Sequence, residues 1–235
     1  LEGVSNSSSI VLGDETNDRS LAMTSSFSNM VLTGQFLAHM WSVEEYVPVC
    51  NSLQKAARSF LPRAAELASK LTHEGYQRVC FVGSGTLVGA TMESALKVLE
   101  LSAGKVQTIW QQTLALRHGP MAALDKETLF VSFVSSELRR RRYELDLLKE
   151  IGSKHLVRGR VAVAVDADAS LSKAADYVLT PEKSAEIPDI YRPILDVIFG
   201  QLLGLFFSLR NGLQPDAPSP NGAISRVVQN VGIYR

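Results

Sequence analysis

The sequence predicts an α/β protein in which a mainly parallel sheet lies between layers of helices. Short runs that are apolar at nearly every position alternate with longer helical segments from residue 78 to residue 209. Such runs are typical of strands that are buried on both faces, as in parallel sheets. A Gly-Ser-Gly-Thr loop also joins the first run to a helical segment, which forms the β-loop-α unit of these sheets.

The first helical segment is expected over residues 20–41, because its apolar residues recur at three- and four-residue steps. We expect it to be capped near Thr24 or Ser25. Its buried face is expected to hold Met23, Phe27, Met30, Val31, Gly34, Leu37 and Ala38. The polar stretch before it contains one apolar run, residues 10–12, which we interpret as a last strand before a loop.

A second helical region is expected over residues 43–71, broken at Pro48 and Pro62. Its inner side is expected to hold Phe60, Leu61, Ala64, Leu67 and Leu71. Five strands are then expected, at residues 78–82, 105–110, 128–134, 161–165 and 177–179. Helices are expected at residues 88–101, 142–151, 170–175 and 190–209, followed by a Pro- and Asn-rich tail.

Composition and charge argue against several classes of protein. The chain has 235 residues, of which 46% are hydrophobic, so it can bury a full α/β core. Lys plus Arg (24) equal Asp plus Glu (24), so no net field holds a nucleic acid. No apolar run reaches the roughly 18 residues of a membrane span, because Asp196 interrupts residues 194–209. Two cysteines, Cys50 and Cys80, fit free thiols in a reducing, cytoplasmic compartment.

The loop at residues 83–86 is the first candidate binding element. Its backbone N–H groups and the Ser84 hydroxyl stand before a helix, where they can hold an anion. The alternative is a tight turn that only reverses the chain. The loop lacks the third glycine of a dinucleotide fingerprint and the lysine of a P-loop, so we expect no nucleotide cofactor.

On the helix that follows, Glu93, Lys97 and Glu100 share one face. The ordinary interpretation is a surface ladder of ion pairs. Glu100, however, lies at the helix end, where the dipole disfavours a carboxylate. That placement would raise its pKa and suit it to proton transfer.

His118 is the histidine that stands in a constrained setting, since Gly and Pro follow it in an Arg-His-Gly-Pro turn. An ordinary pKa of about 6.5 makes it a candidate acid or base; the alternative is a solvated turn residue. His39, His73 and His155 have no chemical partners nearby. No histidines are spaced as metal ligands, so no metal is expected.

The run of four arginines at residues 139–142 follows a strand end, where phosphate is often bound. We favour a solvated surface, because cations at a helix start oppose the dipole. We place this run outside the site.

Together these motifs resemble a known family, the double-SIS (sugar isomerase) proteins. The resemblance rests on Glu-Ser-Ala-Leu-Lys-Val-Leu-Glu-Leu-Ser-Ala-Gly-Lys at 93–105, Arg-His-Gly-Pro at 117–120 and the closing Ser-Arg-Val-Val-Gln. It is strongest to the AgaS-type galactosamine-6-phosphate deaminase / tagatose-6-phosphate ketose-aldose isomerase family. It implies a three-layer α-β-α SIS domain with a five-stranded, flavodoxin-like sheet at residues 73–213. Residues 1–72 would close a first SIS domain and link to the second, and residues 214–235 would form a tail near the active site.

The resemblance also implies roles for particular residues. Glu100 would move a proton between C1 and C2 of an open-chain phosphorylated hexose, and His118 would help to open the ring. In the related glucosamine-6-phosphate synthase this histidine serves the neighbouring subunit, which implies a homodimer with composite active sites. The implied substrate contacts are Ser20, Thr24, Ser25, Ser84, Lys97 and Gln229.

Two departures from the family pattern affect these expectations. Gln229 stands where the synthase has a lysine, so no Schiff-base assistance is expected. The phosphate-binding loops of the first SIS domain would precede Leu1.

A non-catalytic regulator that binds sugar phosphates is the alternative function, and the presence of Glu100 and His118 weighs against it. A glutamine-dependent synthase would need an amidotransferase domain, of which the sequence has no sign.

Overall fold

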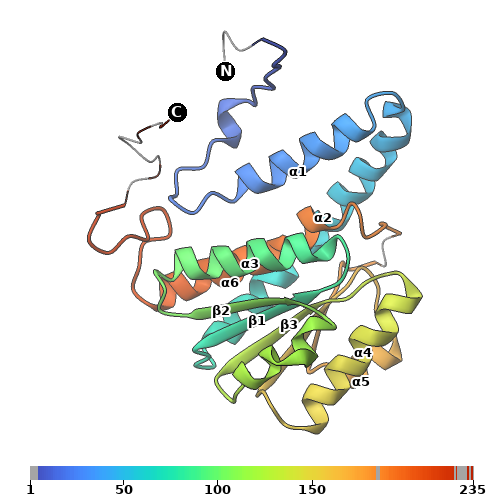
Figure 1. The fold of residues 1–235 in the computed structure, drawn as a ribbon, viewed down its shortest axis with the longest axis vertical. Coiled ribbons are helices and arrows are strands. Elements are labelled where there is room, and N and C mark those ends of the chain that lie inside the picture. The colour runs from blue at the N-terminus through green and yellow to red at the C-terminus, as the bar shows by residue number, and fades with distance from the viewer. Residues whose placement is uncertain (1–4, 184–185, 225, 227–231, 233, 235) are drawn as a thin grey trace.

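A computed structural model describes residues 5–183 and 186–224, together with residues 226, 232 and 234. Its centre is a five-stranded sheet in the order β2-β1-β3-β4-β5, in which every pairing is parallel (Figure 1). The strands are β1 Arg78–Gly83, β2 Gln107–Gln112, β3 Thr128–Phe133, β4 Gly159–Val163 and β5 Tyr177–Leu179. The predicted α/β class and flavodoxin-like strand order are confirmed.

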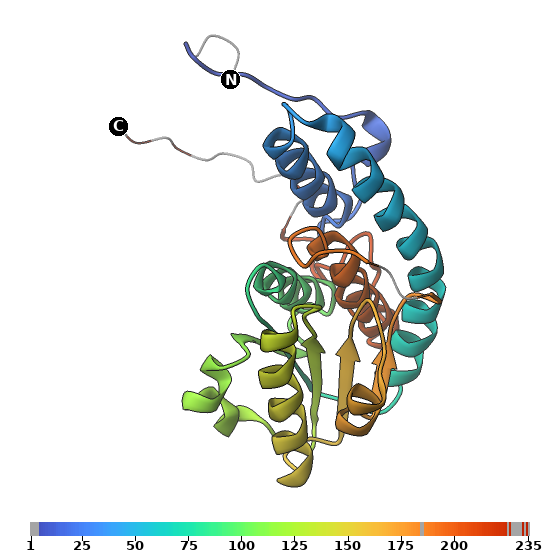
Figure 2. The same ribbon diagram turned by 90° about the vertical axis from the view of Figure 1, so that its right-hand side faces the viewer.

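Helices cover both faces of the sheet (Figures 1 and 2). On one face lie α2 (Val43–Thr72), α3 (Leu87–Leu101) and α6 (Pro193–Arg210), which form a core with alternate strand residues such as Phe81 and Val131. On the other lie α4 (Leu138–Ser153) and α5 (Ala169–Ala174), packed on the intervening residues such as Cys80 and Phe130. Because successive strand side chains point to opposite faces, each strand contributes to two cores.

The order of the strands changes direction at β1. In the sheet, β2 lies on one side of β1, and the next strand in the sequence, β3, lies on the other side. The loops that leave the carboxyl ends of β1 and β3 therefore run apart, and we call the region between them, where Ser135, Ser136 and Asp189 lie, the crevice. In open α/β sheets, ligands usually bind at this position.

Helix α1 (Ser25–Ala38) forms where the sequence predicts it, with Thr24 at its N-cap position. The prediction that it buries one face is wrong, because none of its residues is buried and Met30 is 66% exposed. Figure 2 shows α1 standing away from the sheet, beside the upper half of α2. The predicted strand at residues 10–12 is also wrong: these residues are exposed and unpaired. A strand needs a hydrogen-bonded neighbour, and the described residues offer none there.

Helix α2 runs unbroken for 30 residues through Pro48 and Pro62, so the predicted breaks are wrong. Both prolines lie on the exposed side. Buried residues at three- and four-residue steps, from Leu53 to Leu71, hold the helix against the sheet and α6. This packing outweighs the two missing backbone hydrogen bonds. Leu61, predicted on the inner side, is 50% exposed.

Helix α6 is long and apolar enough, by length and composition alone, to cross a membrane. In the fold it is a core helix, since more than half of it is buried and it packs on α2 and α3. Its Asp196 is fully enclosed and paired with Arg192. The domain limits at residues 72 and 213 stay predictions.

Candidate functional site

Three charged residues on α3 form a partly enclosed cluster. The Lys97 Nζ atom lies 2.6 Å from Glu100 Oε2 and 3.5 Å from Glu93 Oε1. The Lys97 side chain is only 6% exposed, whereas that of Glu100 is 32% exposed. The three residues are therefore not a solvated surface ladder. A buried ammonium holds Glu100 in place while part of its carboxylate reaches solvent.

The carboxylates of Glu93 and Glu100 differ in their electrostatic surroundings. Burial raises the pKa of Glu93, and the nearby Lys97 ammonium opposes that shift without cancelling it. Glu100 also raises the pKa of Glu93 through charge repulsion. Of the two, Glu93 is the more enclosed, and Glu100 is the one that can meet a substrate.

Close packing of α3 on α6 explains why Lys97 is buried. A Cβ atom at Gly204 would lie 2.9 Å from the Lys97 carbonyl oxygen, and one at Gly200 would lie 2.2 Å from Ser94 Cβ. Only glycine permits this approach of the two backbones. The neighbouring helix then covers the lysine stem.

The predicted substrate contacts Ser20, Thr24 and Ser25 lie together at the start of α1. Asp18 accepts hydrogen bonds from Ser25 Oγ at 2.6 Å and from Thr24 Oγ1 at 3.2 Å. Burial opposes ionisation of Asp18, but these bonds outweigh it and lower its pKa. The Ser20 hydroxyl donates to the Pro215 carbonyl at 2.6 Å.

Ser20 and Thr24 line a pocket of about 310 Å³ that continues along α6 to the end of α3. Gln201 of α6 and Leu101 of α3 complete this side of it. Leu101 directly follows Glu100 in the sequence. Ser20 and Thr24 thus lie near the end of α3 that carries the predicted base, although Glu100 itself does not line this pocket.

His118 lies elsewhere in the chain. It ends a short helix, η2 (Ala115–His118), whose Leu116 packs into the core under the opposite face of the sheet from α3. The imidazole is exposed, and Gly119 turns the chain directly after it with φ +143°. Within one chain the structure does not bring His118 to Glu100. Gln229 lies outside the described residues.

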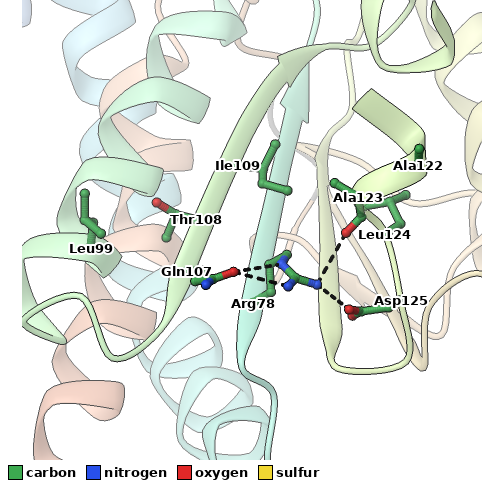
Figure 3. A pocket seen from close by; sticks show the side chains of 9 residues that line it. All are labelled: Arg78, Leu99, Gln107, Thr108, Ile109, Ala122, Ala123, Leu124 and Asp125. Atoms are coloured by element: carbon green, nitrogen blue, oxygen red, sulfur yellow. Dashed lines mark hydrogen bonds and ion pairs between the residues drawn. The ribbon is translucent and has the colours of Figure 1, made fainter. Parts of the chain in front are cut away.

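A separate hollow of about 620 Å³ lies at the edge of the sheet, between these two regions (Figure 3). Its floor is the free edge of β2, and Leu99 of α3 stands on one side. Arg78 spans it, bonded to Gln107, the Ala123 carbonyl and Asp125. None of the predicted site residues lines this hollow.

Ser84 lies at the crevice between β1 and β3, where its hydroxyl donates to Thr113 Oγ1 at 2.9 Å. The side chain there that accepts the most hydrogen bonds is the carboxylate of Asp189, which no sequence motif indicates. That carboxylate accepts from Ser135 and Ser136, which follow β3. The Ser-Ser pair at the carboxyl end of a buried strand was the available signal for the crevice itself.

The four arginines at residues 139–142 all lie inside α4. Glu137 caps this helix, because its carboxylate accepts hydrogen bonds from the backbone N–H groups of Arg139 and Arg140. The prediction of a solvated run is wrong for Arg141. Its side chain is 7% exposed and pairs with Asp166 at 2.6 Å and Asp168 at 3.0 Å. Among the residues that the structure describes, no group of three or more His, Cys, Asp or Glu side chains is arranged to hold a metal ion.

No family model matches this chain, but several known proteins are similar to it in sequence. The chain is 33% identical to D-galactosamine-6-phosphate deaminase AgaS of Escherichia coli O157:H7, over 97% of its own length and 59% of that protein. It is 35% identical to the corresponding Streptomyces coelicolor protein, over 93% and 56%. The chain therefore spans under three fifths of these relatives.

Solved structures give the same picture. A tagatose-6-phosphate ketose/aldose isomerase from Clostridium novyi NT superposes with a TM-score of 0.91 at 33% identity, covering 98% of this chain and 59% of that one. The Escherichia coli enzyme of that name superposes with a TM-score of 0.78 at 29% identity, covering 97% and 60%.

Proposed function

This chain is a homologue of the AgaS-type proteins within the SIS-domain sugar isomerases, and from this premise we propose that it acts on a phosphorylated amino or keto hexose. The reaction is conversion of galactosamine 6-phosphate to tagatose 6-phosphate and ammonia, or the related ketose-aldose isomerisation. The observation that carries the proposal is the buried Lys97 that holds Glu100 at the end of α3, near a pocket lined by Ser20 and Thr24.

In the proposed mechanism Glu100 is the base. It removes the proton from C2 of the open-chain amino sugar, and the electrons form an enolamine between C1 and C2. The Glu100 carboxyl group, which exchanges its proton with solvent, then protonates C1 while an N–H proton passes to O1, and a C2 imine with a C1 hydroxyl results. Water then adds at C2 and ammonia leaves, so the products are a ketose phosphate and ammonia. With a plain hexose the same steps pass through an enediol.

His118 opens the sugar ring by protonating the ring oxygen. Because η2 lies under the opposite face of the sheet from α3, we propose that this imidazole serves the site of a second copy. The protein is then a homodimer with composite sites. The free thiols Cys50 and Cys80 support a reducing, cytoplasmic setting.

The test compares Glu100→Gln with Glu93→Gln, since both carboxylates pair with Lys97 on the same helix. We expect the first variant to lose activity on galactosamine 6-phosphate by about 10²- to 10⁴-fold, as for loss of a general base. The second should keep most of it. Ammonia release and incorporation of solvent deuterium at C1 of the ketose are the measurements.

Unchanged turnover in Glu100→Gln would refute the assignment of the base. Saturable binding of the sugar phosphate by the unaltered protein, with neither ammonia nor deuterium incorporation, would instead favour the non-catalytic regulator.

A further inference from the structure

The crevice between the carboxyl ends of β1 and β3 contains a converging set of hydrogen-bond donors. Ser135 and Ser136 follow β3 and supply two hydroxyls and the Ser136 backbone N–H. Arg192, which is 0% exposed, brings its guanidinium from the start of α6. Arg140 of α4 lies over the opening, against Gly85.

These donors converge on one carboxylate, that of Asp189, although Arg192 also pairs with Asp196 and Arg140 also pairs with Glu137. Its Oδ1 accepts from the Ser136 N–H at 3.0 Å, from the Ser136 hydroxyl at 2.8 Å and from Arg192 Nη1 at 3.1 Å. Its Oδ2 accepts from the Ser135 hydroxyl and lies 3.9 Å from Arg140 Nη1. Two arginines, two hydroxyls and a backbone N–H are the groups that proteins use to bind phosphate or sulfate.

The backbone of Asp189 is also held in place by a hydrogen bond. The backbone carbonyl of Asp189 accepts a hydrogen bond from Thr86 Oγ1 at 2.9 Å, which joins it to the loop after β1. Its side chain is 7% exposed. A carboxylate attached to the chain at this point has a high effective concentration, so a free anion competes poorly with it.

We propose that this crevice is an oxyanion-binding site which the chain fills with its own Asp189 carboxylate, and which accepts inorganic phosphate or sulfate only when that carboxylate is removed. The inference stands independently of the proposed catalytic activity. Where that activity also holds, the phosphate of the sugar is held outside this crevice, and Ser84 serves the loop instead of the substrate.

The experiment measures the melting temperature of the protein in potassium phosphate and in potassium chloride of equal ionic strength. In Asp189→Ala the freed donors should take up phosphate, so this variant should melt lower than the unaltered protein in chloride and regain part of the loss in phosphate, saturably. The matched control is Asp146→Ala, which removes one exposed carboxylate of α4 and should show no such difference.

The unaltered protein should show no phosphate-specific shift. A shift that disappears in Ser136→Ala would overturn the proposal, because the crevice would then be open to ligands. If Asp189→Ala does not fold in chloride, refolding in phosphate should recover it, and Asp189→Ser, which also empties the crevice but leaves a small polar side chain, should show the phosphate-specific shift. Failure of both variants to gain stability from phosphate would also overturn the proposal.

Discussion

Arg192 is the largest side chain that the fold removes completely from solvent among the described residues. Its Nη2 donates to Asp196 at 2.9 Å, and its Nη1 donates to the Val134 carbonyl at 2.7 Å. It therefore ties the start of α6 to the end of β3. Removing one partner of such a buried pair usually costs about 3–5 kcal/mol, since the other charge stays behind without compensation.

Asp196 leads to a pH-dependent prediction. Burial raises its pKa to about 6, although Arg192 opposes the shift. Between the unfolded value of 3.8 and about 6 the unfolded chain binds fewer protons at this residue. The contribution of Asp196 to the free energy of unfolding therefore falls as pH rises through this window, by about 1.4 kcal/mol per unit of pKa shift.

The measurement is urea unfolding of the unaltered protein and of Asp196→Asn at several pH values from 4 to 7. We expect the stability of the unaltered protein, relative to the variant, to decline from about pH 4 to about pH 6. A difference that does not depend on pH would show that the carboxyl titrates normally.

At the scale of elements, the contact between α3 and α6 positions the candidate site. It rests on Gly200 and Gly204, which face Ser94 and the backbone of Lys97. A methyl group at Gly200 would lie 2.7 Å from Ser94 Cα, so the helices would have to separate. This separation would also uncover Lys97 and loosen its hold on Glu100.

We therefore expect Gly200→Ala to lower the free energy of unfolding by about 1–3 kcal/mol, the usual cost of overpacking. The control is Gly89→Ala on the exposed side of α3, where an added methyl meets nothing within 4 Å. That change should be neutral or stabilising by up to about 1 kcal/mol, because alanine favours a helix. Chemical unfolding of both variants tests this, and equal effects would contradict the role given to the glycine contact.

At the scale of the whole molecule, the proposed acid and base lie on opposite faces of one sheet. The surface between them carries exposed apolar side chains on α3 and the edge strand, among them Leu96, Leu99 and Trp110. Exposed apolar patches commonly mark protein contacts. A second copy that covers this region would explain both the patch and the separation of Glu100 from His118.

Mixed subunits test the composite arrangement. Glu100→Gln and His118→Ala should each be inactive alone. When equal amounts are refolded together, half of the dimers are mixed, and one of the two sites in each mixed dimer is intact. Activity should then return to about a quarter of the unaltered level. No recovery, with mixed dimers confirmed by mass, would contradict shared sites.

The sequence by itself determined the strands, the β-loop-α unit, the parallel sheet and the candidate residues Glu100 and His118. A helix or strand that is buried on one or both faces carries its apolar residues at a regular spacing, so these elements can be predicted from residues that are close in the sequence. The same local rules were wrong for Pro48 and Pro62, whose helix is held by distant contacts, and for α1, in which no residue is buried.

Only the tertiary structure decided which of these residues meet. The burial of Lys97 depends on glycines a hundred residues later, and the donors around Asp189 come from β3, α4 and α6. Such contacts join positions that are far apart in the chain. Local spacing carries no information on these distances, because they are set by how the helices pack on the sheet.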